Sequence, residues 1–145
     1  MKINNKASLI AKKEIEIDAP ISHVWKIQTD IEKWPDWQSD VSEASLNGEL
    51  KKGTTFFWKA MGMNIRSSLQ KVEANSVIGW TGDSFGMHAV HYWYFEKKGN
   101  KTLVTSEESL SGWFPKIIKL FKPQFLEDAL AKSLLTLKIH AEKTK

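Results

Sequence analysis

The chain has 145 residues, which suits a single domain over residues 1–145. It has no cysteine, which excludes disulfides, thiolate metal sites and a cysteine nucleophile. The net charge of +4 comes from scattered lysines, with Arg66 as the only arginine, and this is not the clustered pattern of a nucleic-acid binder. No stretch has the roughly 18 apolar residues of a membrane span, and the start of the chain lacks a signal peptide. We therefore expect a cytoplasmic protein without a nucleic-acid partner.

The first part of the chain predicts one strand followed by two short helices. Residues 11–17 alternate between polar and apolar side chains, as a half-buried strand does. Pro20 suits the first turn of a helix, in which Val24 and its apolar neighbours form one face. A second short helix begins near Asp30 and is expected to end at residues 34–37, because a residue before proline avoids the helical region.

The middle of the chain predicts a series of antiparallel strands separated by turns. Six runs have strand period or strand composition, and they cover residues 41–46, 54–60, 64–72, 77–81, 87–97 and 102–110. Between the last two runs, Lys98-Gly99-Asn100 is a tight-turn signal. The strand at residues 41–46 is an edge candidate, through which a homodimer contact is conceivable.

The last third of the chain is helical. Phe114, Ile117, Ile118 and Phe121 form one apolar stripe, and Pro123 interrupts it. An amphipathic helix then runs to about His140, with apolar residues at Leu126, Leu130, Leu134, Leu137 and Ala141. The whole order predicts an α+β fold: a curved antiparallel sheet of about seven strands, two short helices after the first strand, and a long C-terminal helix that the sheet wraps around.

Five stretches carry a resemblance to a known superfamily. They are IDAPISHVWKIQTDIEKWPDW (17–37), GTTFFW (53–58), VIGWTG (77–82), HAVHYWYFE (88–96) and TLVTSEESLSG (102–112). With the terminal helix they resemble the SRPBCC superfamily, also called START-like or birch-pollen-allergen-like, and most closely its polyketide cyclase/dehydrase branch. The resemblance implies the helix-grip fold, with a cavity between sheet and long helix that accepts a hydrophobic small molecule.

The aromatic run at residues 88–96 is expected to form one wall of that cavity. Successive strand residues point to opposite faces, so Ala89, His91, Trp93 and Phe95 share one face. This face matches the H-x-W-x-F pattern of the family and is the better inner face, since the other face carries groups that prefer water. If Gly99 and Asn100 form the turn, the facing pairs are His91 with Glu108, Trp93 with Ser106, and Phe95 with Val104. A register slip of one would turn Glu107 inward instead.

His91 and Glu108 are the candidate chemical groups. Such a pair can orient a ligand hydroxyl or carbonyl, act as a general acid and base, or simply satisfy two half-buried polar groups. Ser67 and Ser106 would add hydroxyls to the wall. The four histidines are too dispersed for a metal site, and no glycine pattern fits a nucleotide, so we expect neither metal nor cofactor.

The rest of the ligand-binding wall is expected to be apolar and to come from both the sheet and the C-terminal helices. Its candidates are Phe56, Trp58, Leu69, Trp80, Trp93, Phe95, Phe121, Phe125, Leu130 and Leu134.

Residues 112–125, GWFPKIIKLFKPQF, have an unusual composition. Lys116, Lys119 and Lys122 lie three apart, and large apolar residues dominate the other side. The segment fits an anionic membrane surface, a mobile entrance flap, or the plain start of the terminal helix with a solvated lysine face. We favour the plain helix and expect no membrane contact.

These features predict binding of a hydrophobic or aromatic small molecule, lipid-like or polyketide-like. One alternative is a cofactor-independent cyclase/dehydratase that uses the His91–Glu108 pair. A further alternative is a protein-interaction module similar to chaperone co-factors, for which we expect a filled interior and an exposed apolar patch.

Overall fold

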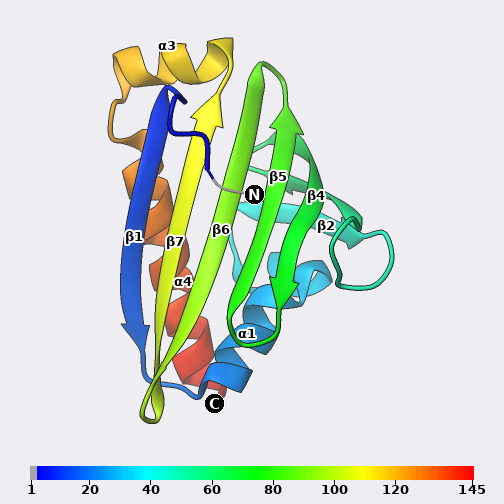
Figure 1. Ribbon diagram of the computed structural model, residues 1–145, viewed down its shortest axis with the longest axis vertical. Coiled ribbons are helices and arrows are strands. Elements are labelled where there is room, and N and C mark those ends of the chain that lie inside the picture. The colour runs from blue at the N-terminus through cyan, green and yellow to red at the C-terminus, as the bar shows by residue number, and fades with distance from the viewer. Residues whose placement is uncertain (1–2) are drawn as a thin grey trace.

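The computed structural model describes residues 3–145, which form one antiparallel sheet, four α-helices and a short 3-10 helix (Figure 1). The seven strands lie in the order β1-β7-β6-β5-β4-β3-β2. Their bounds are β1 (Leu9–Ile17), β2 (Val41–Leu46), β3 (Thr55–Ala60), β4 (Met63–Glu73), β5 (Val77–Ser84), β6 (Met87–Lys98) and β7 (Lys101–Ser111). The helices are α1 (Ile21–Thr29), η1 (Ile31–Lys33), α2 (Trp34–Trp37), α3 (Trp113–Phe121) and α4 (Phe125–Thr144).

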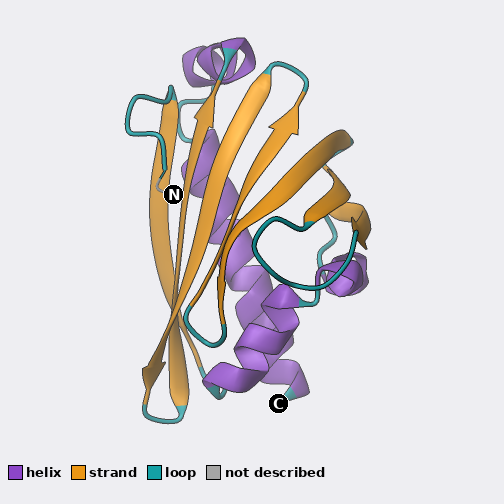
Figure 2. Ribbon diagram, turned by 45° about the vertical axis from the view of Figure 1, so that its right-hand side comes forward, coloured by secondary structure: helices purple, strands orange, loops and turns teal. Residues whose placement is uncertain are grey.

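The sheet curves around α4, as the sequence predicted. Figure 2 shows α4 running along one face of the sheet, with α3 across one end. At the opposite end, α1 packs beside the end of α4, and His23 Nε2 lies 3.1 Å from the Ala141 carbonyl oxygen. The strand β2 lies at one edge of the sheet, so the homodimer contact predicted there stays a prediction. Within residues 3–145, no helix is both long and apolar enough to cross a bilayer.

The hairpin of β6 and β7 has the predicted register. His91 faces Glu108, Trp93 faces Ser106 and Phe95 faces Val104. Gly99, in the two-residue turn, has a φ of 64°, which glycine adopts without strain. The slipped alternative is excluded, because Glu107 lies on the outer face and accepts a hydrogen bond from the Tyr94 hydroxyl.

The second helical segment ends at Trp37, within the predicted residues 34–37, but the reason we gave, that a residue before proline avoids the helical region, is wrong. Trp34 is helical, with φ −51° and ψ −41°, and residues 34–37 form α2 with Pro35 in its first turn. A proline in the first turn needs no N–H, so its cost there is small. The buried Trp34 side chain holds the turn in place: its Nε1–H donates to the Gln28 carbonyl oxygen, and its ring packs edge-on against Phe56.

The outer face of the sheet is more buried than the alternation of polar and apolar residues along β6 predicts. Val90 and Tyr92 point outward on β6, yet both are buried, packed with Val77 and beneath Ile3. The Tyr92 ring lies directly on Gly79, where an added Cβ would come within 2.6 Å of a ring carbon. The segment before β1 therefore covers part of a face that we expected to be exposed to water.

Candidate ligand-binding cavity

A cavity of about 740 Å³ lies between the sheet and the first half of α4. This volume is in the range of small-molecule sites. Its walls come from the loop after α2, strands β2 to β7, the α3–α4 connection and α4.

The cavity exists because small side chains face each other across it. Ala60, Gly82 and Ala89 line it on the sheet, and Ala129 and Ser133 line it on α4. None of these side chains is large enough to reach the opposite wall.

Further along α4 the interior is solid. Leu134, Leu137 and Ala141 are buried in the same cluster as Trp34 and Phe56. The helix therefore packs tightly over its second half and lines the open space with its first half.

His91 is buried in the sheet wall of the cavity, between two indole rings. Its ring centroid lies 5.1 Å from that of Trp80 and 5.4 Å from that of Trp93. Nδ1 is 3.3 Å from Glu108 Oε2, and Nε2 is 2.7 Å from Ser106 Oγ. In the neutral tautomer that satisfies both contacts, Nδ1–H donates to the carboxylate and Nε2 accepts the serine hydroxyl.

Of these three groups, the Glu108 carboxylate is the one with capacity left for a ligand. Glu108 and His91 both line the cavity, whereas Ser106 is buried behind them. Both ring nitrogens of His91 are occupied by protein partners. Glu108 makes no polar side-chain contact other than His91 within the described part of the chain.

Ser84 supplies a second polar point near the β5–β6 turn. Its side chain lines the cavity, and Oγ is buried without a hydrogen-bond partner among residues 3–145. Because Oγ has almost no exposed surface, the hydroxyl does not face the open space, and a change of side-chain rotamer would be needed to present it to a ligand.

The predicted binding residues divide into three groups. Six line the cavity: Trp58, Trp80, His91, Glu108, Phe125 and Leu130. Seven are buried outside its lining: Phe56, Ser67, Leu69, Trp93, Phe95, Ser106 and Leu134. Ser67 nevertheless supports the wall, because its Oγ accepts a hydrogen bond from the Trp58 indole at 3.0 Å.

Phe121 alone forms the third group. We expected it to face the sheet, but its side chain is 76% exposed. The reason is that α3 lies across the end of the sheet and ends at Phe121, so this last residue is not directed inward.

The sequence did not reveal the residues that form the rim. Lys132 on α4 makes an ion pair with Asp40 in the loop before β2, with a distance of 2.9 Å between Nζ and Oδ2. Both residues line the cavity, and so do Met61, Met63 and Met87, three of the four methionines of the chain. Methionine suits a surface that adapts to a ligand. Met61 and Met63 are close in the sequence, but nothing in it joins them to Met87, Asp40 or Lys132, because these segments meet only after folding.

Within residues 3–145, no group of three or more His, Asp or Glu side chains is arranged to hold a metal ion.

A sequence model of the family described as polyketide cyclase/dehydrase and lipid transport matches residues 9–142. The chain belongs to this family, and so to the SRPBCC superfamily that its motifs resemble. A search of curated proteins finds no match.

Solved structures with the same fold include a hypothetical protein from Helicobacter pylori, at 17% identity and a TM-score of 0.84, covering 96% of this chain and 91% of that one. The Zhui aromatase/cyclase from Streptomyces sp. R1128 is 12% identical with a TM-score of 0.81, covering 92% and 93%. Truncated norcoclaurine synthase from Thalictrum flavum is 13% identical with a TM-score of 0.72, covering 94% of both chains. At these identities the likeness shows the fold.

Proposed function

We propose that the protein binds a hydrophobic or aromatic small molecule in the cavity between the sheet and α4. The observation that carries this proposal is a large cavity with ring and methionine walls and one carboxylate held by a buried histidine. Burial of apolar surface would supply most of the affinity, and a few polar groups would set orientation. A filled interior, which we expected of a protein-interaction module, is not what the structure has.

The polar groups narrow the class of ligand. Glu108 offers a hydrogen-bond acceptor inside an apolar site, and the ligand therefore needs a donor, such as a phenol or an alcohol, at that point. Ser84 pairs with Met87 at the β5–β6 turn, whereas Glu108 faces His91 further along β6, so Ser84, after a change of side-chain rotamer, would serve a second oxygen of the ligand. A ligand with an apolar ring system and hydroxyls, of the polyketide type, fits both requirements.

Binding is testable with anilinonaphthalene sulfonate, an aromatic probe that fluoresces when it leaves water. We expect excitation of Trp58 and Trp80 to transfer energy to the bound probe. Ala129→Trp fills the cavity from α4 and should abolish the signal, whereas Ala131→Trp, on the exposed side of the same helix, should leave it unchanged. Equal signals from both variants would contradict binding in the cavity.

A cyclase/dehydratase activity is the second candidate, and the Glu108–His91 contact is the observation that favours it. With Glu108 as base, the carboxylate would take the proton from the carbon beside a ligand carbonyl and return it to the β-hydroxyl, which leaves as water as the new C=C bond forms. His91 would orient the carboxylate. Here the imidazole is a positioning group, because both of its ring nitrogens are engaged by Glu108 and Ser106.

The activity is testable with a β-hydroxy aryl ketone, whose loss of water yields an enone with a new ultraviolet band. Wild-type protein should accelerate the reaction. Glu108→Gln should remove the acceleration while the variant still binds the probe, and His91→Ala should reduce the acceleration without removing it. If the protein binds the probe but does not accelerate the reaction, the result would support a carrier function and contradict the enzymatic one.

A further inference from the structure

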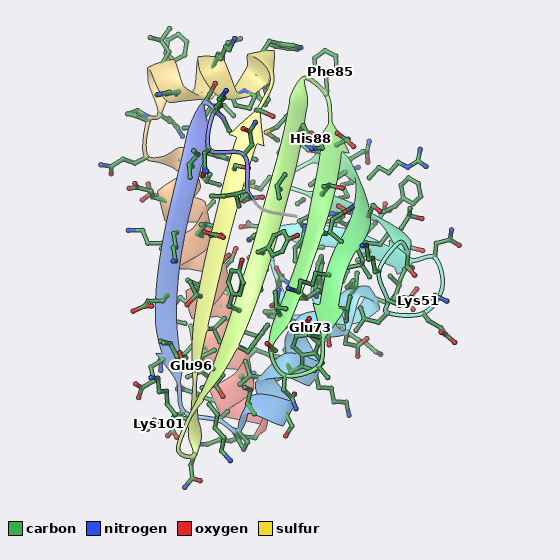
Figure 3. All side chains as sticks on the ribbon, in the orientation of Figure 1. Lys51, Glu73, Phe85, His88, Glu96 and Lys101 are labelled. Atoms are coloured by element: carbon green, nitrogen blue, oxygen red, sulfur yellow. The ribbon has the colours of Figure 1, made fainter. Side chains whose placement is uncertain are left out.

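Five apolar side chains gather, exposed to solvent, at the end of the molecule where α3 lies. They are Phe85, Trp113, Ile117, Leu120 and Phe121, hereafter the apolar end patch. Phe85 projects from the tip of the β5–β6 turn beside α3 (Figure 3), and its ring meets Trp113 edge-on at 5.2 Å. Phe85 is 83% exposed and Leu120 is 77% exposed, values rare for side chains of this size.

Helix α3 has apolar residues on two faces. One face packs against the rest of the protein, and the other is exposed to solvent. Pro115 is buried and Ile118 is half-buried against the body of the protein. Trp113, Ile117 and Leu120 have the spacing i, i+4, i+7 and therefore share the outer face. We expected a solvated lysine face here; Lys116 and Lys119 are exposed, but large apolar side chains are exposed beside them.

Specific backbone contacts hold α3 against the β5–β6 turn, so the patch has a defined structure. The Phe114 N–H donates to the Gly86 carbonyl oxygen at 3.1 Å, which joins α3 to the β5–β6 turn. A Cβ on Gly86 would lie 2.4 Å from the Trp113 ring, and a Cβ on Gly112 would lie 2.4 Å from the Gly86 oxygen. Both glycines also have positive φ, so the close approach of turn and helix requires them.

The charges carried by α3 and the residue after it are all positive, and the one acid near Phe85, Asp83, is paired with His88 at 2.6 Å. Lys116, Lys119 and Lys122 lie on or next to α3, and the chain has no acidic residue between Glu108 and Glu127. A second copy docked through a two-fold axis would set lysines against lysines, which is unfavourable. Large rings and leucines flanked by lysines are instead the composition of a surface that lies in the headgroup region of an anionic bilayer.

We propose that the apolar end patch docks the protein on an anionic phospholipid membrane. The patch is continuous with the cavity rim, since Ser84 and Met87 flank the β5–β6 turn and Lys122 follows α3, and all three line the cavity. Docking would place that part of the rim at the lipid surface, so a hydrophobic ligand could pass between bilayer and cavity. The docking surface itself rests on its own residues and does not depend on the identity of the ligand.

Co-sedimentation with vesicles tests the proposal. We expect binding to phosphatidylcholine vesicles that contain phosphatidylglycerol, much weaker binding to pure phosphatidylcholine, and loss of binding as NaCl rises from about 0.05 to about 0.5 M. Leu120→Ser with Phe121→Ser should abolish binding. Leu135→Ser with Ile139→Ser, which removes two exposed apolar side chains from α4, should not.

The lysines are tested in the same assay. Lys116→Gln with Lys119→Gln should weaken partitioning by about five-fold per charge removed. Lys12→Gln with Lys13→Gln on β1 changes the net charge equally, away from the patch, and should have a much smaller effect.

All substituted side chains are exposed, so we expect the thermal unfolding temperature of each variant to be unchanged. Binding of the fluorescent probe in the cavity is a second check that each variant is folded. Wild-type protein that stays in the supernatant with anionic vesicles would overturn the proposal. So would equal losses in the patch and control variants, or a dimer in solution that the Leu120→Ser variant dissociates. Loss of vesicle binding with retained probe binding would support docking separately from the cavity.

Discussion

The two tyrosines of the chain are neighbours on the outer face of β6, and both environments favour the neutral phenol. The rings of Tyr92 and Tyr94 stack with centroids 6.1 Å apart. Burial raises the pKa of Tyr92. Burial and the adjacent Glu107 carboxylate raise the pKa of Tyr94 to about 12.

Ultraviolet titration measures the pKa values of these two tyrosines directly, because no other residue in the chain forms a phenolate. The absorbance of the folded protein near 295 nm should rise only well above pH 10, and Glu107→Gln should move part of the rise to lower pH. Unfolded protein should titrate near the ordinary value of 10.0. Since the raised values favour the folded state below pH 10, stability should fall as the pH rises beyond it. A rise near pH 10 while circular dichroism still shows the folded state would contradict the assignment.

A substitution at Gly79 tests how tightly the Tyr92 ring packs on the backbone of β5. An alanine Cβ would overlap the ring, which is buried and has no room to turn away. We expect Gly79→Ala to reduce the free energy of unfolding by about 1–3 kcal/mol, measured by urea denaturation. The loss should shrink in a Tyr92→Leu background, and an unchanged loss there would place its cause elsewhere.

At the scale of elements, the end of α4 is fastened to the turn after β1. Glu142 accepts a hydrogen bond from Lys138 Nζ at 2.6 Å and from the Asp18 backbone N–H at 2.8 Å. The Lys138 hydrogen bond, with that of Asp18, lowers the pKa of the Glu142 carboxyl. The stabilisation is therefore present above the ordinary value of 4.5 and is lost as the pH falls through the lowered value.

Glu142→Gln should lower the free energy of unfolding at pH 7 by less than about 1 kcal/mol, because the pair is partly exposed. The difference from wild type should vanish in acid, below the lowered pKa. Denaturation at the two pH values measures it, and Glu127→Gln at the other end of α4 is the matched control. A difference that persists in acid would mean that the lost contact is not ionic.

At the scale of the whole molecule, the interior is closely packed along the second half of α4 and contains the cavity along the first half. Leu137 is fully buried within the solid half, and Leu130 is equally buried but borders the cavity. Leu137→Ala should cost about 2–5 kcal/mol, since it opens a new void. Leu130→Ala only widens a cavity that is already there, and it should cost less. Equal losses in chemical denaturation would contradict this division.

Much of this architecture follows from local pattern. Period-two runs, the Gly99-Asn100 turn and the leucine repeat of α4 each reflect short-range geometry, so they predicted the strands, the β6–β7 register and the long helix. The same register placed His91 opposite Glu108 and Trp93 opposite Ser106. The sequence also contained the lysines and apolar residues of α3, although not which of its faces would be covered.

Other features depended on contacts between distant segments. The helical turn at Trp34 holds because that side chain packs against Phe56, which overrides the local effect of Pro35. The cavity depends on small residues of β3, β5, β6 and α4 that meet only after folding, and no periodicity encodes how far a helix stands from a sheet. The sequence by itself therefore determined the fold and the polar pair, and tertiary packing decided where the interior stays open and which face of α3 meets solvent.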